Sequence, residues 1–149
     1  MGLDMYLSRR QYVKNWNHTR PEDRFQGVAF KGNVAIDLSK LTQLEFEVMY
    51  WRKVNAIHQW FVDNVQNGDD NCEEYYVTRE TLEKLITTIE HVLENKDDAE
   101  KLLPTTEGFF FGSDEMDDYY WDQLHETRWT LKEAIEKHPQ DDYYYRASW

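Results

Sequence analysis

Cysteine, proline, glycine and basic residues are all scarce in this chain of 149 residues, and each shortage excludes a class of protein. The single cysteine, Cys72, excludes an internal disulfide, which is typical of proteins from a reducing compartment. Three prolines and six glycines leave no room for long low-complexity linkers. No apolar run approaches the roughly 18 residues of a membrane helix, so we expect a cytoplasmic protein that does not contact membranes.

Acidic residues outnumber basic residues by 29 to 17, which gives the chain a formal net charge of −12. Binding to nucleic-acid phosphates needs a basic surface, so we expect no direct nucleic-acid binding. An acidic exterior is typical of a solvated surface, and it also suits a protein that occupies the DNA site of another protein. The composition, 40% hydrophobic and 31% charged, indicates a single globular domain over residues 1–149.

Alternating apolar and polar residues predict a small sheet. Residues 3–7 and 45–50 alternate, as half-buried strands do. Residues 142–149, with three consecutive tyrosines, predict a terminal strand that pairs with residues 3–7 and ties down both ends of the chain. Residues 8–40 are polar and irregular, and we expect a long excursion there.

Apolar residues at helical spacing predict three main helices. The first covers residues 51–66, the second follows an N-cap at Thr78, and the third runs from an N-cap at Ser113 to a stop at Pro139. Residues 97–103 add one or two turns, and the apolar residues 108–112 predict a short strand or tight loop. The sequence therefore predicts an α+β fold, with three helices packed on a small, mainly antiparallel sheet.

Several functional side chains gather in the first predicted helix. His58 lies within its apolar arc, where loss of water disfavours the charged form, so we expect a neutral imidazole. This histidine is either a core residue bonded to the backbone or a ligand contact in a pocket. Arg52 and Lys53 either meet an anion or pair with nearby acids. Asn55 adds a polar group, and Trp60 either packs in a second layer or is an exposed binding aromatic.

The last predicted helix carries a second stripe, formed by Trp121, His125 and Trp129 at four-residue spacing. Such a ladder of rings either stacks a flat ligand such as a nucleobase or packs the helix on the strands. If the rings of both helices converge, they line one ligand site. The candidate ligand-binding residues are then Arg52, Lys53, Asn55, His58, Trp60, Trp121, His125 and Trp129.

Templates for metal, phosphate and nucleophile chemistry are missing. The chain has no P-loop ending in Gly-Lys-Ser/Thr, and His125 lacks the second histidine of a zinc protease helix. The acidic turn at residues 69–74 misses the spacing of a calcium loop. Carboxylates near Cys72 favour its protonated thiol, which is a poor nucleophile. We therefore predict no metal and no cofactor, and we assign no catalytic residue.

Several sequence words resemble those of a family of small uncharacterised phage and prophage proteins. They are MGLDMYL (residues 1–7), YWRK (50–53), Asn55, Ile57, His58, WFV (60–62), NVQ (64–66), LLPT (102–105), GFFFGS (108–113) and SW (148–149). The resemblance spans nearly the whole chain, apart from residues 8–45 and the acidic turn. It implies a small protein in the host cytoplasm that acts on the host.

Three functions are compatible with these patterns. The first is a non-enzymatic pocket protein that binds and sequesters a small polar or nucleotide ligand, as in phage counter-defence. The second is an acidic, DNA-mimic-like inhibitor that binds a host nucleic-acid-binding protein. The third is an enzyme that acts on a nucleotide. Residues 143–145 either indicate a homo-oligomer, because protein interfaces are enriched in tyrosine, or are ordinary strand residues.

Overall fold

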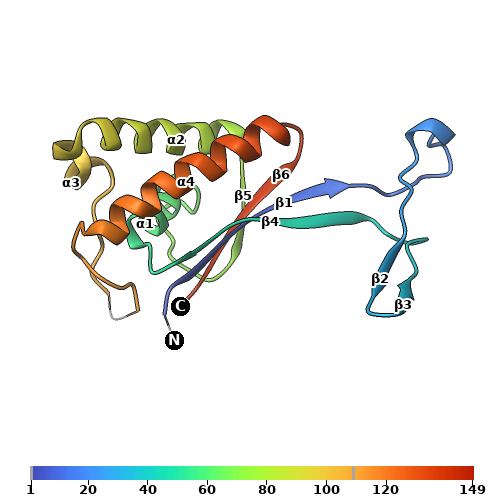
Figure 1. Cartoon of the computed structure of the whole chain (residues 1–149), viewed down its shortest axis with the longest axis horizontal. Helices are drawn as coiled ribbons and strands as arrows, with labels where there is room; N and C mark the ends of the chain where they lie inside the picture. Colours follow the sequence, from blue (N-terminus) through green and yellow to red (C-terminus); the bar gives the residue numbers. More distant parts are fainter. Residues whose placement is uncertain (1, 109) are drawn as a thin grey trace.

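The two ends of the chain lie side by side in one antiparallel sheet, as the computed structural model of the protein shows (Figure 1). The structure describes residues 2–108 and 110–149. The four strands have the order β4-β1-β6-β5. Their bounds are β1 (Asp4–Tyr12), β4 (Gln43–Arg52), β5 (Glu74–Val77) and β6 (Asp142–Ser148). Met5 lies opposite Ala147, which confirms the predicted pairing of the two terminal strands.

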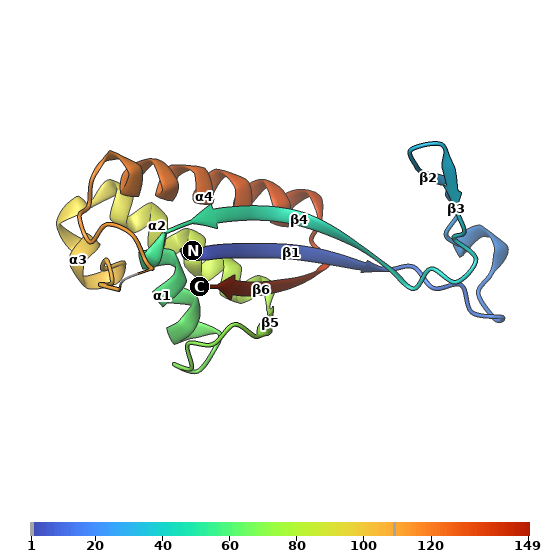
Figure 2. The same ribbon diagram turned by 90° about the horizontal axis from the view of Figure 1, so that it is seen from below.

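Helices cover only one face of this sheet, and the view from below shows the strands in front of them (Figure 2). The helices are α1 (Asn55–Asn64), α2 (Arg79–Glu94), α3 (Ala99–Leu102) and α4 (Asp118–Lys137), with 3-10 turns η1 (Pro21–Asp23) and η2 (Lys96–Asp98). The predicted α+β architecture is thus confirmed, with α3 and η2 as the extra turns. Among the described residues, no helix is long and apolar enough to cross a membrane.

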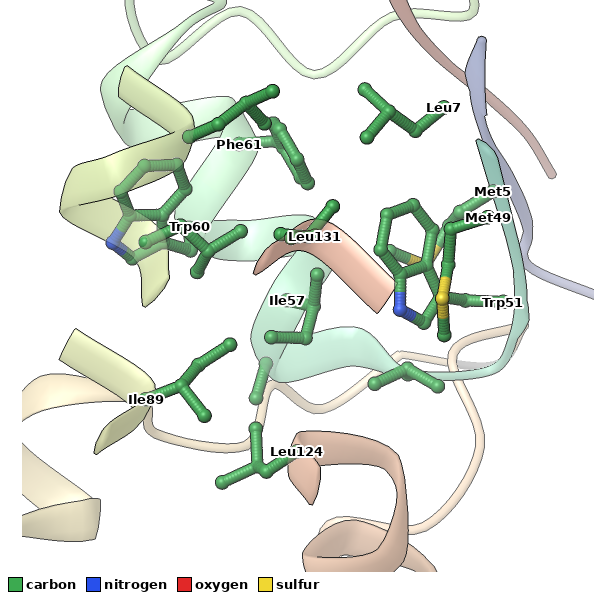
Figure 3. Packing of buried hydrophobic residues seen from close by; sticks show 14 of the residues in the cluster. Met5, Leu7, Met49, Trp51, Ile57, Trp60, Phe61, Ile89, Leu124 and Leu131 are labelled. Atoms are coloured by element: carbon green, nitrogen blue, oxygen red, sulfur yellow. The ribbon is translucent and has the colours of Figure 1, made fainter. Parts of the chain in front are cut away.

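The core lies between the sheet and the helices. Met5 and Leu7 of β1 point into it because successive strand residues face opposite sides (Figure 3). The rings of Phe61 and Tyr145 stack with centroids 3.9 Å apart, which joins α1 to β6. The indole Nε1 of Trp51 donates a 2.7 Å hydrogen bond to the hydroxyl of Thr127, so the buried ring keeps a polar partner.

The boundary between β4 and α1 differs from the prediction. Trp51 and Arg52 end β4 rather than begin a helix, since Trp51 pairs with Met5 across the sheet. Lys53 takes a φ of 56°, a left-handed conformation that turns the chain out of the strand. The helix therefore begins at Asn55.

The start of α4 also differs from the prediction. Asp117, not Ser113, is its N-cap, and its carboxylate accepts a 3.0 Å hydrogen bond from the backbone N–H of Tyr120. The Ser113 hydroxyl instead accepts from the N–H of Glu115, within the preceding loop. The predicted strand or loop at residues 108–112 is a turn at residues 110 and 111; residue 109 lies outside the described residues.

Residues 13–42 form an arm that projects from the body beyond the ends of β1 and β4 (Figures 1 and 2). One part of it is a two-stranded sheet of β2 (Ala29–Lys31) and β3 (Val34–Ile36). This hairpin, here called the arm tip, turns to one side, and the loop that carries η1 lies farther from the body (Figures 1 and 2). Gly32 takes a φ of +59° in the turn between them, a conformation that favours glycine. The predicted excursion therefore contains regular structure in the arm tip.

Candidate functional site

The imidazole and indole of α1 are sealed in the interior. His58 has 1% of its surface exposed and Trp60 has 7%. Trp60 packs among the apolar side chains of the core cluster (Figure 3). The expected convergence of these rings on a solvent-reachable hollow is therefore wrong for α1, since close packing leaves no room for a ligand beside them.

His58 belongs to a chain of polar groups that runs from the core, at His58 and Tyr145, to the partly exposed Asp70 and the exposed Trp149. Its Nδ1 lies 2.7 Å from the Tyr145 hydroxyl, and its Nε2 lies 3.0 Å from a carboxylate oxygen of Asp70. The indole N–H of Trp149 donates to the same Asp70 oxygen at 3.2 Å. A carboxylate only accepts, so the neutral ring donates from Nε2 to Asp70 and accepts from Tyr145 at Nδ1. The partners of this core histidine are therefore side chains, not the backbone.

The protonation of His58 follows from its burial. Loss of water lowers the pKa of His58 below its usual 6.5, and the charge of Asp70 and its hydrogen bond offset part of that shift. Burial also raises the pKa of Tyr145 well above its usual value. Both side chains are thus neutral at pH 7, as expected for His58. This network ties α1, β6 and the acidic turn together, and both ring nitrogens of His58 are engaged within the protein.

The predicted stripe of Trp121, His125 and Trp129 runs along α4 and does not join His58 and Trp60 of α1 in one site. Trp129 has 65% of its surface exposed, and His125 is exposed as well. Trp121 is half-buried, with its indole N–H donating to the carbonyl of Met116 at 3.1 Å. The Lys96 ammonium lies 4.7 Å from the centroid of the Trp121 ring. The three side chains therefore have three different environments, and they do not form one stacking surface.

Lys53 and Asn55 are the two predicted residues that share a hollow, at the start of α1. The hollow has a volume of about 130 Å³, and Glu115 and Asp117 also line it. Ligand pockets commonly span about 300–1,000 Å³, so a nucleotide does not fit in this space. The lysine shares the hollow with two carboxylates, which suits pairing with acids better than binding a phosphate.

Asn55 uses its polar atoms to hold the loop before α4. Its amide nitrogen donates to the carbonyls of Phe111 and Ser113, at 3.0 and 2.9 Å. Its amide oxygen accepts from the backbone N–H of Thr106 at 2.9 Å. Arg52 is exposed, and its guanidinium lies 3.9 Å from Asp4. Asn55 therefore positions a loop, and Arg52 lies at the surface beside an acid.

The arm presents an apolar surface that the rest of the chain does not cover. Its exposed apolar side chains are Trp16, Val28, Phe30, Val34 and Ile36. Val28 is 83% exposed, Val34 70% and Phe30 63%. Exposed apolar groups that gather in one place mark interaction sites. A two-stranded sheet alone is marginally stable in water, so contact with a partner would stabilise the arm tip.

The charge of the arm is opposite to that of the body. Residues 13–42 carry five basic and three acidic side chains, a net charge of +2. Since the whole chain carries −12, the remaining residues carry −14. A protruding, apolar and weakly basic arm therefore stands on a strongly acidic body.

The acidic residues of the body concentrate at the end opposite the arm, where α3 and the start of α4 lie (Figure 1). Residues 94–122, here called the acidic end, contain ten acidic residues and two lysines, a net charge of −8. Glu100, Asp114 and Glu115 line one hollow there, with Pro104 and Met116 as apolar neighbours. Two acidic segments that are separate in the sequence thus form one surface.

The helix-free face of the sheet carries tyrosines and arginines. The Arg10 guanidinium binds the carboxylate of Glu74 at 2.7 Å and lies 4.0 Å over the ring of Tyr144. The guanidinium of Arg146 lies 5.4 Å from the centroid of the Tyr6 ring. These cations are engaged within the chain. The face is therefore less suited to a charged partner than the arm or the acidic end.

Sequence reasoning missed the arm tip and the partners of His58. Two short apolar runs around Lys31, Gly32 and Asn33 are a hairpin signal that could have located β2 and β3. The partners Asp70 and Tyr145 are 12 and 87 residues away, and no local pattern identifies them. Tyr143 and Tyr145, two of the three tyrosines expected at an interface, are buried in the core instead.

Comparison of the chain with protein-family models, with curated proteins and with solved structures gave no match. Membership of a phage or prophage family therefore stays a prediction. Within the described residues, no group of three or more histidine, cysteine, aspartate or glutamate side chains is arranged to hold a metal ion. The surfaces that remain as candidate functional sites are the arm and the acidic end.

Proposed function

We propose that this chain is an acidic binding protein that engages another protein through its arm and its acidic end. The observation that carries the proposal is the arm, which exposes Val34 and Ile36 on one face of its two-stranded sheet and Phe30 on the other. Monomeric proteins seldom leave such a group of apolar side chains uncovered. Binding energy at protein interfaces is concentrated in a few such side chains.

The acidic end indicates the chemical class of the partner. A surface with a net charge of −8 attracts a basic protein and repels nucleic acid. Proteins that bind DNA or RNA carry basic surfaces for phosphate, and these surfaces fit the acidic end. The proposed activity is therefore inhibition of a nucleic-acid-binding protein by occupation of its basic surface. In a phage context, that protein belongs to the host.

Sequestration of a nucleotide is the weaker candidate. It depended on a hollow shared by His58, Trp60 and the rings of α4, but His58 and Trp60 are buried while Trp129 is exposed. The hollow beside Lys53 and Asn55 is smaller than a nucleotide needs. Ligand binding stays a prediction, which calorimetry with a panel of nucleotides and cyclic nucleotides tests directly.

Inhibition of a DNA-binding protein provides the test. Proteins of a bacterial lysate are bound to DNA-cellulose, and the purified chain is added to release its target. The expected result is release of one discrete basic protein. The double variant Phe30→Ser, Ile36→Ser and the triple variant Glu100→Lys, Asp114→Lys, Glu115→Lys should each raise the concentration needed by about thirtyfold, the effect of losing about 2 kcal/mol.

Matched substitutions elsewhere separate the proposed surfaces from general effects. Trp129→Ser removes an equally exposed apolar side chain from the body. Glu73→Lys, Glu80→Lys and Glu136→Lys together change the net charge as much as the acidic-end variant does. Both controls should release the target as the wild type does. Equal potency of the arm and control variants would show that the arm is not a binding surface.

A further inference from the structure

The arm tip has two apolar faces and a lysine. Phe30 lies opposite Ala35 in the two-stranded sheet, so these side chains share one face. Ile36 and Val34 lie on the other face, where Lys31 pairs with Val34. The tip therefore needs a partner surface that combines apolar contacts with negative charge.

The acidic end has the complementary chemistry. Its hollow of about 390 Å³ is lined by Pro104 and Met116, which offer apolar contacts, and by three carboxylates. Those carboxylates belong to Glu100, Asp114 and Glu115. The arm tip and the acidic end are thus complementary, because both offer apolar contacts and their charges are opposite in sign.

We infer that the arm of one copy docks on the acidic end of a second copy of this chain. The two surfaces lie at opposite ends of the long axis of the molecule (Figure 1). Two copies that lie side by side in opposite directions bring each arm to the partner's acidic end. Both contacts then form at once, and the assembly closes as a two-fold dimer.

Charge at the two contacts supports this occupant. The arm carries +2 and the acidic end −8, so these surfaces attract each other in separate copies. The two bodies carry −14 each and repel each other, so the attraction at the two contacts must outweigh this repulsion. The inference rests on the proposed function: the arm and the acidic end that close the dimer are also the surfaces proposed for the foreign basic protein, so that protein displaces the second copy.

Sedimentation equilibrium of the full chain tests the inference. We expect a monomer–dimer equilibrium in about 0.1 M NaCl, where the Debye length of about 10 Å leaves contacts between neighbouring charges effective. Lys31→Glu and Glu100→Lys should each weaken the dimer at least about tenfold, since each sets like charges against each other. Lys40→Glu, at the base of the arm, and Glu80→Lys, in the first turn of α2, are the matched controls, and both should leave the dimer intact.

Mixing the two variants gives the sharpest result. A Lys31→Glu chain paired with a Glu100→Lys chain has opposite charges at both contacts, so the mixture should form heterodimers with wild-type affinity. A chain that stays monomeric at all concentrations, or a mixture that does not recover, overturns the inference. A monomeric chain whose arm binds duplex DNA, measured by fluorescence anisotropy, overturns it as well.

The two proposals fail separately. If the wild-type chain is monomeric and the acidic-end triple variant is still impaired in releasing the foreign protein from DNA-cellulose, only the dimer is disproved. If the dimer forms as described and no DNA-binding protein is released from DNA-cellulose, the proposed inhibition is disproved and the dimer stands.

Discussion

The Nδ1 atom of His58 and the hydroxyl of Tyr145 lie 2.7 Å apart, and this contact links α1 to β6 inside the core. The Nε2–H of His58 donates a hydrogen bond to Asp70, so Nδ1 carries no hydrogen. The Tyr145 hydroxyl is therefore the donor to Nδ1. His58 therefore has a structural role. This arrangement leaves the exterior of the molecule as the place to look for function.

Tyr145→Phe should lower the free energy of unfolding by about 1–3 kcal/mol, because it leaves His58 Nδ1 buried without a partner. Urea denaturation followed by fluorescence measures the change. Tyr144→Phe is the matched control, since Tyr144 is half-buried on the helix-free face, and it should change stability by less than about 0.5 kcal/mol. Equal effects of the two substitutions would contradict the proposed role of the contact.

Stability should fall as the pH drops below about 6.5, the usual pKa of histidine. The folded pKa of His58 lies below that of the unfolded chain, so between these values only the unfolded chain takes up the proton. The loss is about 1.4 kcal/mol for each pH unit between the two pKa values, and it ends below the folded pKa. Urea midpoints at several pH values check this window.

His58→Gln is the control for the pH dependence. Glutamine keeps one donor and one acceptor but does not titrate. The stability difference between wild type and this variant should therefore shrink as the pH is lowered through the window. A constant difference from neutral pH to about pH 5 would show that His58 does not cause the pH dependence.

Thr127→Val should cost about 1–3 kcal/mol of unfolding free energy, although valine has nearly the same shape as threonine. The substitution removes the acceptor of the Trp51 indole N–H and leaves that donor buried. Thr130→Val, on a half-buried position of the same helix, makes the same chemical change. It should have an effect below about 0.5 kcal/mol in the same urea titration.

Asp117→Ala should destabilise the protein by about 1 kcal/mol, because it removes the N-cap of α4. Ser113→Ala should cost less, since the Ser113 hydroxyl bonds only within an exposed loop. Thermal unfolding of both variants, followed by circular dichroism, ranks them. The reverse ranking would indicate that the helix begins earlier than described.

Much of the fold could be predicted because the spacing of apolar residues indicates which face of a strand or helix is buried. Apolar alternation located β1 and β4, and helical spacing located α2 and α4, since each has one buried face. The boundary at Trp51 could not be predicted, because alternation and helical spacing overlap there. Only the left-handed conformation of Lys53 ends the strand, and lysine is not a residue that signals such a turn.

The candidate site was harder to predict, since spacing along a helix does not say what covers each face. Trp121, His125 and Trp129 do lie along α4, but their exposure depends on distant elements. The chemistry of the arm was missed for a different reason. Phe30 and Ile36 lie in strands of three residues, too short for alternation to be read.

Amide hydrogen exchange tests most directly that the arm and the acidic end are the binding surfaces, when the chain at a concentration that keeps it monomeric is compared with the chain bound to its released target. We expect the amides of β2, β3 and the acidic end to exchange at least about tenfold more slowly in the complex. The helix-free face of the sheet should be unchanged. Protection on that face, with unchanged exchange in the arm, would contradict the account.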